Sequence, residues 1–207
     1  AEGYKRQQLD NGQMWIGTTT DGAYRLQLDK NELTHPILKG NITSIYQDSE
    51  GELWIGSWEE GLHHVKTDGT IEIFEYDAKN PYSISSNFVR ACCEDNLGNI
   101  WIGTFNGLNR YDKSTGLFQN HTASDAQSDG LTHSSIWCIV KDNQGTLWLG
   151  TYFGGVNYFN PEYEIYSRYM YSPIEKKGLS NPVVGRTIED KDGNLWIGTE
   201  GGGLNYY

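Results

Sequence analysis

The chain has 207 residues and a formal net charge of −11, from 16 Lys and Arg against 27 Asp and Glu. Affinity for nucleic acid comes from clustered basic residues, so this balance argues against a phosphate backbone as a partner. No apolar run reaches the roughly 18 residues that suggest a membrane-spanning helix, so we expect none in this chain. Twenty-five glycines, seven tryptophans and fourteen tyrosines instead favour short strands joined by tight turns.

A tetrapeptide of the form Trp-Ile-Gly-Thr occurs five times. Its tryptophans are 39, 47, 47 and 48 residues apart. Self-similarity at a period of roughly 40 to 50 residues indicates one supersecondary unit repeated, as in solenoids and propellers. We therefore treat residues 1–207 as a single unit with repeats at approximately 1–40, 41–86, 87–134, 135–182 and 183–207. The copies are Trp15–Thr18, Trp54–Ser57, Trp101–Thr104, Trp148–Thr151 and Trp196–Thr199.

The first repeat departs from the others ahead of its tryptophan. Arg6 and Gln7 stand where later repeats carry apolar pairs, and Leu9 stands where they carry Asp. Strands of this kind are expected to present apolar side chains to a core. The sequence therefore does not support a first strand in this repeat.

The second repeat shows the unit most clearly. Short apolar or alternating runs at 42–48, 52–57, 61–65 and 71–76 are separated by turn residues, which predicts four strands, A to D. Four antiparallel strands at this period describe one blade of a β-propeller, whose blades surround a central channel. Strand B is apolar at successive positions, as expected where both faces of a sheet are covered, so its tryptophan belongs to the core. We predict an all-β partial β-propeller with four-stranded antiparallel blades and about five repeats.

The turn between strands A and B carries Asp six residues before the tryptophan and Gly three before it. Asp can hydrogen-bond its own backbone two residues on, and Gly accepts the left-handed conformation of a tight turn. Ca²⁺ prefers about six or more oxygen ligands, and each turn offers only one or two carboxylates, so we expect no metal site. The residues concerned are Asp48, Asp95, Asp142 and Asp190, with Gly51, Gly98, Gly145 and Gly193.

The sequence stops at Tyr207, after strand C of the fifth repeat. Either the chain is a piece of a longer protein, or a small propeller closes by pairing its terminal strands. A piece would expose unpaired strand edges and apolar blade faces, which favour association. We therefore expect self-association through the ends of the repeat array.

The fifth repeat also allows a family to be named. Residues 189–199 read Glu-Asp-Lys-Asp-Gly-Asn-Leu-Trp-Ile-Gly-Thr, and residues 202–206 read Gly-Gly-Leu-Asn-Tyr. This pattern resembles the two-component regulator propeller repeat. Segments such as 107–111 and 155–158 extend the resemblance over nearly the whole chain.

The resemblance implies a function that the residues alone do not. Such repeats form the extracytoplasmic sensor of hybrid two-component histidine kinases, common in gut Bacteroidetes, where they control polysaccharide utilisation. It implies a periplasmic location and an oligosaccharide signal from polysaccharide breakdown. It also implies a membrane anchor and a kinase elsewhere in the parent protein, with the parent's dimer as a further route of association.

The candidate ligand-binding face combines two kinds of loop. The B to C loops and the long connections between repeats, at about 77–86, 122–134 and 171–181, emerge on the same face of a propeller. Variable loops on a rigid scaffold often carry binding residues. Aromatic rings beside a carboxylate and an amide would suit sugar binding; alternatively, the rings pack beneath the long connections. The candidates are Trp58, Glu59, Phe105, Asn106, Tyr152 and Phe153.

Catalysis is not expected. Glu59, Glu60 and Glu200 share the candidate face, so a polysaccharide lyase or hydrolase propeller stays an alternative. A structural or dimerisation propeller without a small ligand is another. The five histidines lack metal-ligand spacing, and no nucleophile elbow, phosphate loop or redox motif appears. We therefore predict no catalytic residue, no metal and no cofactor.

Overall fold

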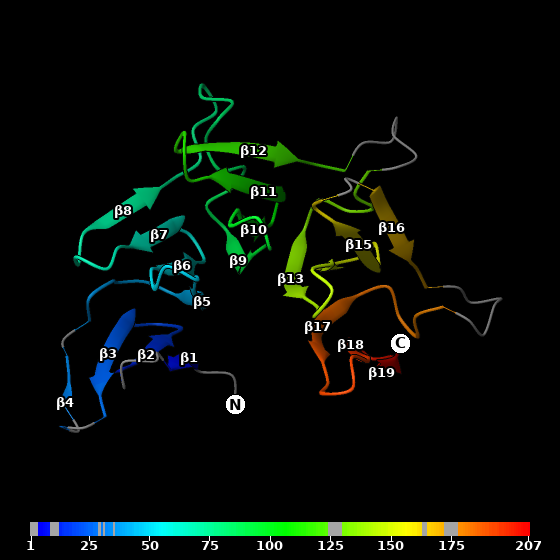
Figure 1. Cartoon of the computed structure of the whole chain (residues 1–207), viewed down its shortest axis with the longest axis horizontal. Helices are drawn as coiled ribbons and strands as arrows, with labels where there is room; N and C mark the ends of the chain where they lie inside the picture. Colours follow the sequence, from blue (N-terminus) through cyan, green and yellow to red (C-terminus); the bar gives the residue numbers. More distant parts are fainter. Residues whose placement is uncertain are drawn as a thin grey trace.

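The computed structural model describes residues 4–8, 13–28, 30, 32–34, 36–123, 130–162, 165–171 and 178–207. These residues form five antiparallel sheets, each with its strands in chain order from one edge to the other. Figure 1 shows the sheets arranged in an arc around a central axis, with β1, β5, β9, β13 and β17 innermost. The prediction of an all-β propeller built of four-stranded blades is therefore confirmed.

The strand bounds follow the repeats. The first two sheets hold β1 (Tyr4–Gln8), β2 (Gln13–Thr18), β3 (Ala23–Gln27) and β4 (Glu32–Leu33), then β5 (Ile42–Gln47), β6 (Leu53–Ser57), β7 (Leu62–Val65) and β8 (Ile71–Phe74). The next two hold β9 (Val89–Glu94), β10 (Ile100–Thr104), β11 (Gly107–Asp112) and β12 (Leu117–His121), then β13 (Ile136–Lys141), β14 (Leu147–Thr151), β15 (Val156–Asn160) and β16 (Ile165–Tyr169). The last holds β17 (Val184–Glu189), β18 (Leu195–Thr199) and β19 (Gly203–Tyr206).

The expectation for the first repeat is wrong, because β1 is present and pairs with β2 over five residues. The pairing uses backbone N–H and C=O groups, which every residue except proline offers, so polar side chains do not prevent it. Leu9 lies outside the described residues. The fifth sheet has three strands, and no described strand of the first sheet pairs with it. In the described part of the chain, no helix is long and apolar enough to cross a membrane.

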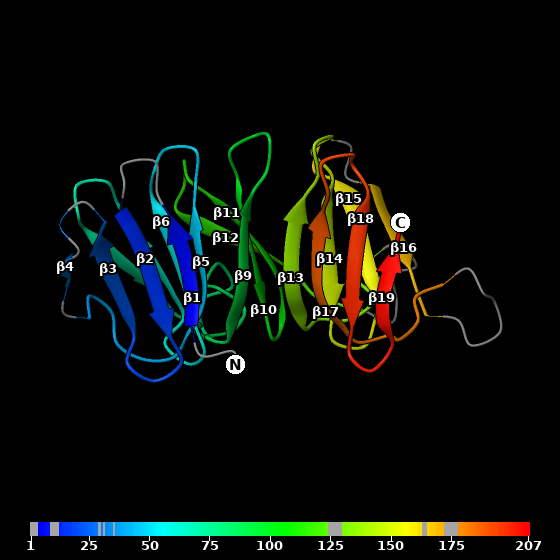
Figure 2. The same ribbon diagram turned by 90° about the horizontal axis from the view of Figure 1, so that it is seen from below.

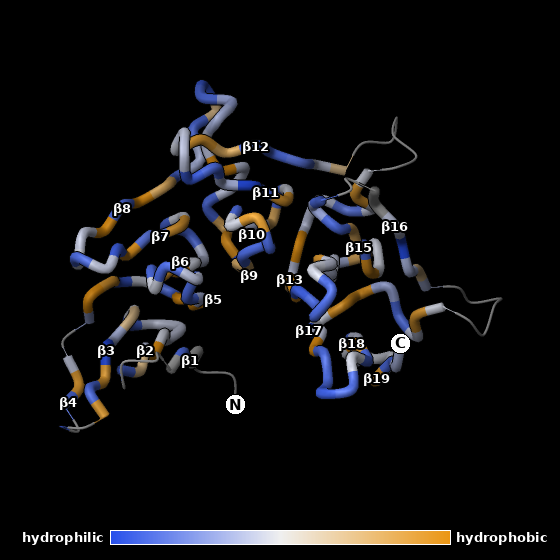
Figure 3. Tube along the Cα trace, viewed as in Figure 1, coloured by the Kyte–Doolittle hydropathy of each residue, from blue (hydrophilic) through white to orange (hydrophobic). Residues whose placement is uncertain are grey.

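The two edges of the blades carry different connections. Figure 2 shows the β5–β6, β9–β10 and β17–β18 turns along one edge, and the β2–β3 and β18–β19 loops along the opposite edge. The β17–β18 turn is hydrophilic, whereas hydrophobic residues gather on the strands (Figure 3). The A to B turns and the B to C loops therefore define two faces, which we call the turn face and the loop face.

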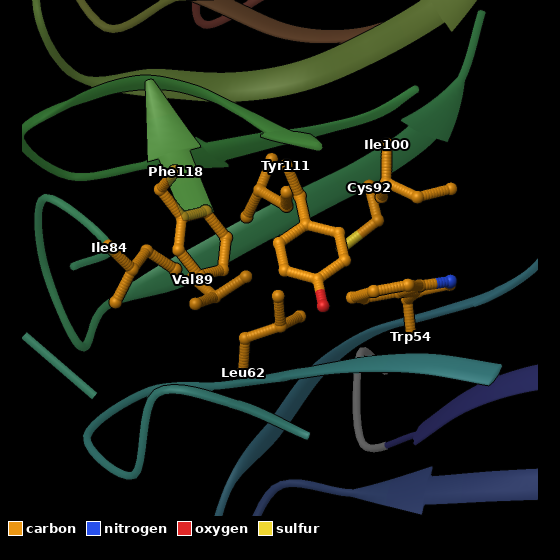
Figure 4. Packing of buried hydrophobic residues seen from close by; sticks show 9 residues of the cluster. Trp54, Leu62, Ile84, Val89, Cys92, Ile100, Tyr111 and Phe118 are labelled. Carbon is orange, nitrogen blue, oxygen red and sulfur yellow. The ribbon is translucent and has the colours of Figure 1, made fainter. Parts of the chain in front are cut away.

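The hydrophobic core lies between blades. Trp54 of β6 is fully buried against residues of the following blade, including Val89 and Tyr111, whose ring centroid is 5.1 Å away (Figure 4). A buried aromatic side chain of this size contributes a few kcal/mol, so each such interface is a main source of stability. The equivalent tryptophans, at most 6% exposed, are Trp15, Trp101 and Trp148.

In the second to fifth repeats, one carboxylate of the turn between strands A and B fixes the tryptophan that follows it. Asp48 Oδ1 accepts hydrogen bonds from the backbone N–H groups of Glu50 and Glu52, at 3.1 and 2.9 Å. Its Oδ2 accepts the indole Nε1–H of Trp54 at 2.9 Å. The expected turn role is confirmed, but the bond to the indole went unpredicted. The same bond from indole Nε1–H to Asp Oδ2 measures 2.7 Å in Asp95–Trp101 and 2.8 Å in both Asp142–Trp148 and Asp190–Trp196.

The glycine of the tetrapeptide marks the closest approach of neighbouring blades. A Cβ on Gly103 would lie 2.7 Å from Cγ2 of Ile136, the first residue of β13. One on Gly56 would lie 2.7 Å from Cγ1 of Val89, the first residue of β9. Any side chain there would push the next blade away, because interiors are close-packed. Gly198 differs, since the nearest atom to its Cβ position is the carbonyl oxygen of Arg186 in its own blade, at 3.5 Å.

The last blade accordingly has an open face. Leu204 lies opposite Gly198 in the sheet and is 64% exposed. The residues opposite the other glycines, which face a following blade, are 0% exposed. These are Ala23, Leu62, Leu108 and Val156.

A matched pair of substitutions tests the role of this glycine. Gly103→Ala is expected to lower the free energy of unfolding by about 1–3 kcal/mol, through overpacking against Ile136. Gly198→Ala is expected to change it by less than about 0.5 kcal/mol, because no neighbouring blade faces it. Urea unfolding midpoints at an unchanged m-value measure both. Equal effects at the two positions would contradict the inter-blade role.

A second prediction concerns the Asp–indole bond. Hydrogen bonds from Trp196 and Asn194 lower the pKa of Asp190 from 3.8 to about 2. A depressed folded-state pKa means that the stabilisation is complete above the unfolded value and is lost as the pH falls toward about 2. Asp190→Asn should therefore destabilise the protein at neutral pH, by a margin that shrinks between about pH 4 and 2.

The measurement is the difference in urea midpoint between variant and wild type at several pH values. Asp192→Asn is the control, because that exposed carboxylate lies in the same turn and makes no contact with an indole. If both variants show the same pH profile, the Asp–indole bond is not the source of the effect.

Candidate functional site

A hollow of about 930 Å³ lies at the centre of the arc. Residues of all five repeats line it, from Thr19 in the first to Glu200 in the last. Clefts between structural units are where ligand sites tend to lie. The hollow is therefore the natural place to look for a binding site.

Four of the innermost strands aim one residue each into the hollow through a β-bulge. In β5, Ile42 and Ser44 pair with the consecutive residues Ser57 and Gly56, so Thr43 has no cross-strand partner. The same register shift occurs in β9, β13 and β17. Bulges redirect side chains and are frequent next to functional sites. The four bulge residues, all lining the hollow, are Thr43, Arg90, Trp137 and Gly185.

Two of these bulge residues form a stack with two loop residues. The guanidinium carbon of Arg90 lies 4.2 Å from the ring centroid of Trp58 and 4.2 Å from that of Trp137. Trp137 in turn stacks on Tyr152, with centroids 5.2 Å apart and an interplanar angle of 11°. We call Trp58, Arg90, Trp137 and Tyr152 the stacked column. It joins the second, third and fourth repeats.

The other predicted residues lie beside the column. Phe153 packs against Tyr152 at 4.3 Å and is 56% exposed. Phe105 is 53% exposed and reaches the column through Phe88, which contacts both Phe105 and Trp58. Trp58 and Tyr152 are half-buried, so the rings are neither free in solvent nor fully covered by the long connections. Glu59 and Asn106 are exposed on the same loops.

Phe88, Arg90 and Trp137 are site residues that the sequence analysis missed. One available signal was that Trp58 and Trp137 are the only tryptophans outside the tetrapeptide. A second was that the position directly after the first apolar residue of strand A changes from repeat to repeat, while the residue before it is always Ile or Val. Residues 124–129 and 172–177 of the long connections lie outside the described residues.

Backbone hydrogen bonds hold the loops in place. The N–H of Trp58 donates to the carbonyl of Asn41 at 2.9 Å, and the N–H of Tyr152 donates to that of Ser135 at 3.0 Å. Phe105 donates in the same way to Phe88 at 3.0 Å. Each candidate loop is thus tied to the residue just ahead of an innermost strand, which sets its ring beside the hollow.

The turn face carries a different charged cluster. Carboxylate oxygens of Asp48, Glu50 and Glu52 lie within 4.8 Å of one another. Lys113, from the following blade, places its Nζ 3.0 Å from Asp48 Oδ2 and 3.2 Å from Glu50 Oε2. Burial works to lower the pKa of Lys113, but its bonds to Asp48 and Glu50 raise it overall. The cluster is therefore an ion pair between blades, with the ammonium as its cation.

The sheets arranged around a lined hollow define a β-propeller segment. Its sequence matches the two-component regulator propeller model at residues 36–59, 83–106, 130–153 and 178–201. Each match runs from the end of a long connection through strands A and B into the B to C loop. The chain is therefore built of two-component regulator propeller repeats and belongs to that family.

Solved structures share this fold. The extracellular domain of a putative hybrid two-component system from B. thetaiotaomicron has a TM-score of 0.78 at 24% identity, over 98% of this chain and 26% of that one. The extracellular domain of a putative one-component system from the same organism has 0.75 at 22% identity, over 96% and 26%. Virginiamycin B lyase from Staphylococcus aureus has 0.71 at 15% identity, over 99% and 69%.

The chain spans about a quarter of the two extracellular domains that it resembles. At these identities the likeness establishes the propeller fold and leaves the ligand open. No curated protein sequence matches the chain.

Proposed function

We propose that this chain is part of an extracytoplasmic sensor of a two-component system, located in the periplasm, and that it binds an oligosaccharide from polysaccharide breakdown. The repeat family and the extracellular domains that share the fold support a sensor role. The ligand would bind at the loop face, where the stacked column borders the hollow. Transmission of the signal then belongs to other parts of the parent protein.

The stacked column is the observation that carries this proposal. The aromatic rings of the B to C loops are not needed to build a blade, because the first and last repeats have Thr19 and Glu200 where the second, third and fourth have Trp58, Phe105 and Tyr152. Aromatic faces pack well against the C–H faces of sugar rings, and nearby polar groups can fix hydroxyl orientation. The half-exposed rings of Phe105 and Phe153 extend this surface beyond the column.

We further propose that the region is not catalytic. A general acid in glycoside cleavage needs a raised pKa, which burial supplies. The glutamates on the loop face, Glu59, Glu60 and Glu200, are all exposed. Because a lyase shares this fold, the enzyme alternative calls for a direct assay. We expect no new reducing ends when polysaccharide is incubated with the protein.

Paired substitutions in the column test the binding site. The double variant Trp58→Ala, Tyr152→Ala should weaken oligosaccharide binding at least about tenfold, because each aromatic contact contributes about 1 kcal/mol beyond its buried area. Titration calorimetry with oligosaccharides that bind the wild type measures this. Tyr76→Ala is the control, since Tyr76 is 52% exposed and lies away from the hollow. Unchanged affinity in a folded double variant would refute the site.

A second candidate function is association without a small ligand. The open face of the last blade favours it, because a row of apolar side chains there has no cover. Ile188, Trp196 and Tyr206 lie in one cross-strand row, and Ile188 and Tyr206 are 62% and 60% exposed. Large exposed apolar patches usually mark contact surfaces. We propose that a second copy of the chain packs there.

This proposal predicts concentration-dependent association of the isolated chain. The double variant Leu204→Arg, Tyr206→Arg should weaken association at least about tenfold, because it places charges in an apolar contact. Leu117→Arg, at a leucine that is 43% exposed on another blade, should have no effect. Light scattering measures both, and a strictly monomeric wild type at high concentration would contradict the proposal.

A further inference from the structure

We infer that the ligand of the hollow carries an anionic group on its sugar ring, a carboxylate or a sulfate ester, and that Arg90 pairs with it. This inference rests on the proposed oligosaccharide binding and narrows its ligand to acidic sugars.

The first observation is that Arg90 has no counter-ion within the described part of the chain. Its guanidinium takes part in none of the ion pairs there, and its Nε is buried without a hydrogen-bond partner. Burial alone lowers the pKa of Arg90, yet an arginine stays charged at neutral pH. Half-buried charges are normally paired, because removing a charge from water is costly. Arg90 is therefore a positive charge in need of a partner.

The second observation is how the guanidinium is held. The guanidinium carbon lies over both indoles, 4.2 Å from the ring centroid of Trp58 and 4.2 Å from that of Trp137, an arrangement that cation–π attraction stabilises. Hydrogen bonding is then left to the N–H groups in the guanidinium plane. Those groups form a fork that matches the paired oxygens of a carboxylate or a sulfate. Arg90 stands at the bulge of β9 and lines the hollow, so a ligand in the hollow lies next to this residue.

The third observation is the distribution of charge. The charged residues lining the hollow are Arg90, Arg186 and Glu200, in a chain whose net charge is −11. The acidic residues of the A to B turns lie on the opposite face of the blades (Figure 2). A cleft concentrates the field of the charges that line it, so the hollow attracts anions despite the acidic surface around it. Stacking rings beside a guanidinium suit an acidic sugar better than a simple inorganic anion.

The test compares acidic oligosaccharides with neutral counterparts of the same size. One pair of probes is trigalacturonate and its carboxyl-reduced trisaccharide; the other is a carboxyl-reduced chondroitin disaccharide that keeps its sulfate, and the desulfated form of that same disaccharide. We expect the wild type to bind at least one acidic probe about tenfold or more tightly than its neutral partner, with an affinity that falls as salt increases. The two pairs distinguish a carboxylate from a sulfate.

Substitutions at Arg90 assign the preference to this residue. Arg90→Gln keeps a planar group beside the indoles and removes the charge, so it should abolish the preference for the acidic probe. Arg90→Lys should retain part of the preference, because it keeps a point charge without the fork. Lys191→Gln removes the same charge from an exposed position on the turn face and should leave the preference intact.

The outcomes separate this inference from the proposed function. If acidic and neutral probes bind the wild type equally, or if Arg90→Gln keeps the preference, the inference is wrong while oligosaccharide binding stands. If neither these probes nor a broad panel of oligosaccharides binds the wild type, both fail. Should Arg90→Gln not fold, a preference in a folded Arg90→Lys that is clearly weaker than in the wild type supports the inference, and a full preference there contradicts it.

Discussion

The hydrogen bond from the indole of strand B to the aspartate of the preceding turn is the interaction on which the rest of the fold depends. One carboxylate closes the turn with one oxygen and holds the tryptophan with the other. Because hydrogen bonds to an ionised acceptor are strong, the ring cannot rotate without losing a strong bond to the carboxylate that closes the turn. The tryptophan is thereby presented to the next blade in one orientation, and the glycine two residues later lets that blade approach. Local turn chemistry thus sets the spacing of the whole array.

Because a few residues of each repeat suffice to stack the blades, other positions are available for binding. Aspartate, tryptophan and glycine recur because each meets a demand of blade stacking, whereas the bulge position does not require one particular residue. Thr43, Arg90, Trp137 and Gly185 occupy equivalent places with four different side chains. Stability and recognition are therefore carried by separate residues of the same short segment, only a few positions apart.

The sequence predicted the fold well because its signals are repeated and local. Periodicity, turn residues and apolar runs agree in several copies, so one degenerate copy does not change the predicted fold. The error at β1 arose because side-chain pattern was used to judge a strand that pairs through its backbone. For the site, the loop aromatics could be found by their offset from the tryptophan. Arg90 and Trp137 were missed, because a bulge is a property of the register between two strands. Only the variation at one position of strand A, and a tryptophan outside the tetrapeptide, pointed to them.

The stacked column also has a mechanical consequence. Its members come from three successive blades, with Trp58 in the second, Arg90 in the third, and Trp137 and Tyr152 in the fourth. A tilt of one of these blades against the next must separate a ring from the guanidinium or shear the two past each other. The angular spacing of the blades and the integrity of the column are therefore coupled. A ligand that holds Arg90 in place would stiffen this part of the arc against such tilting.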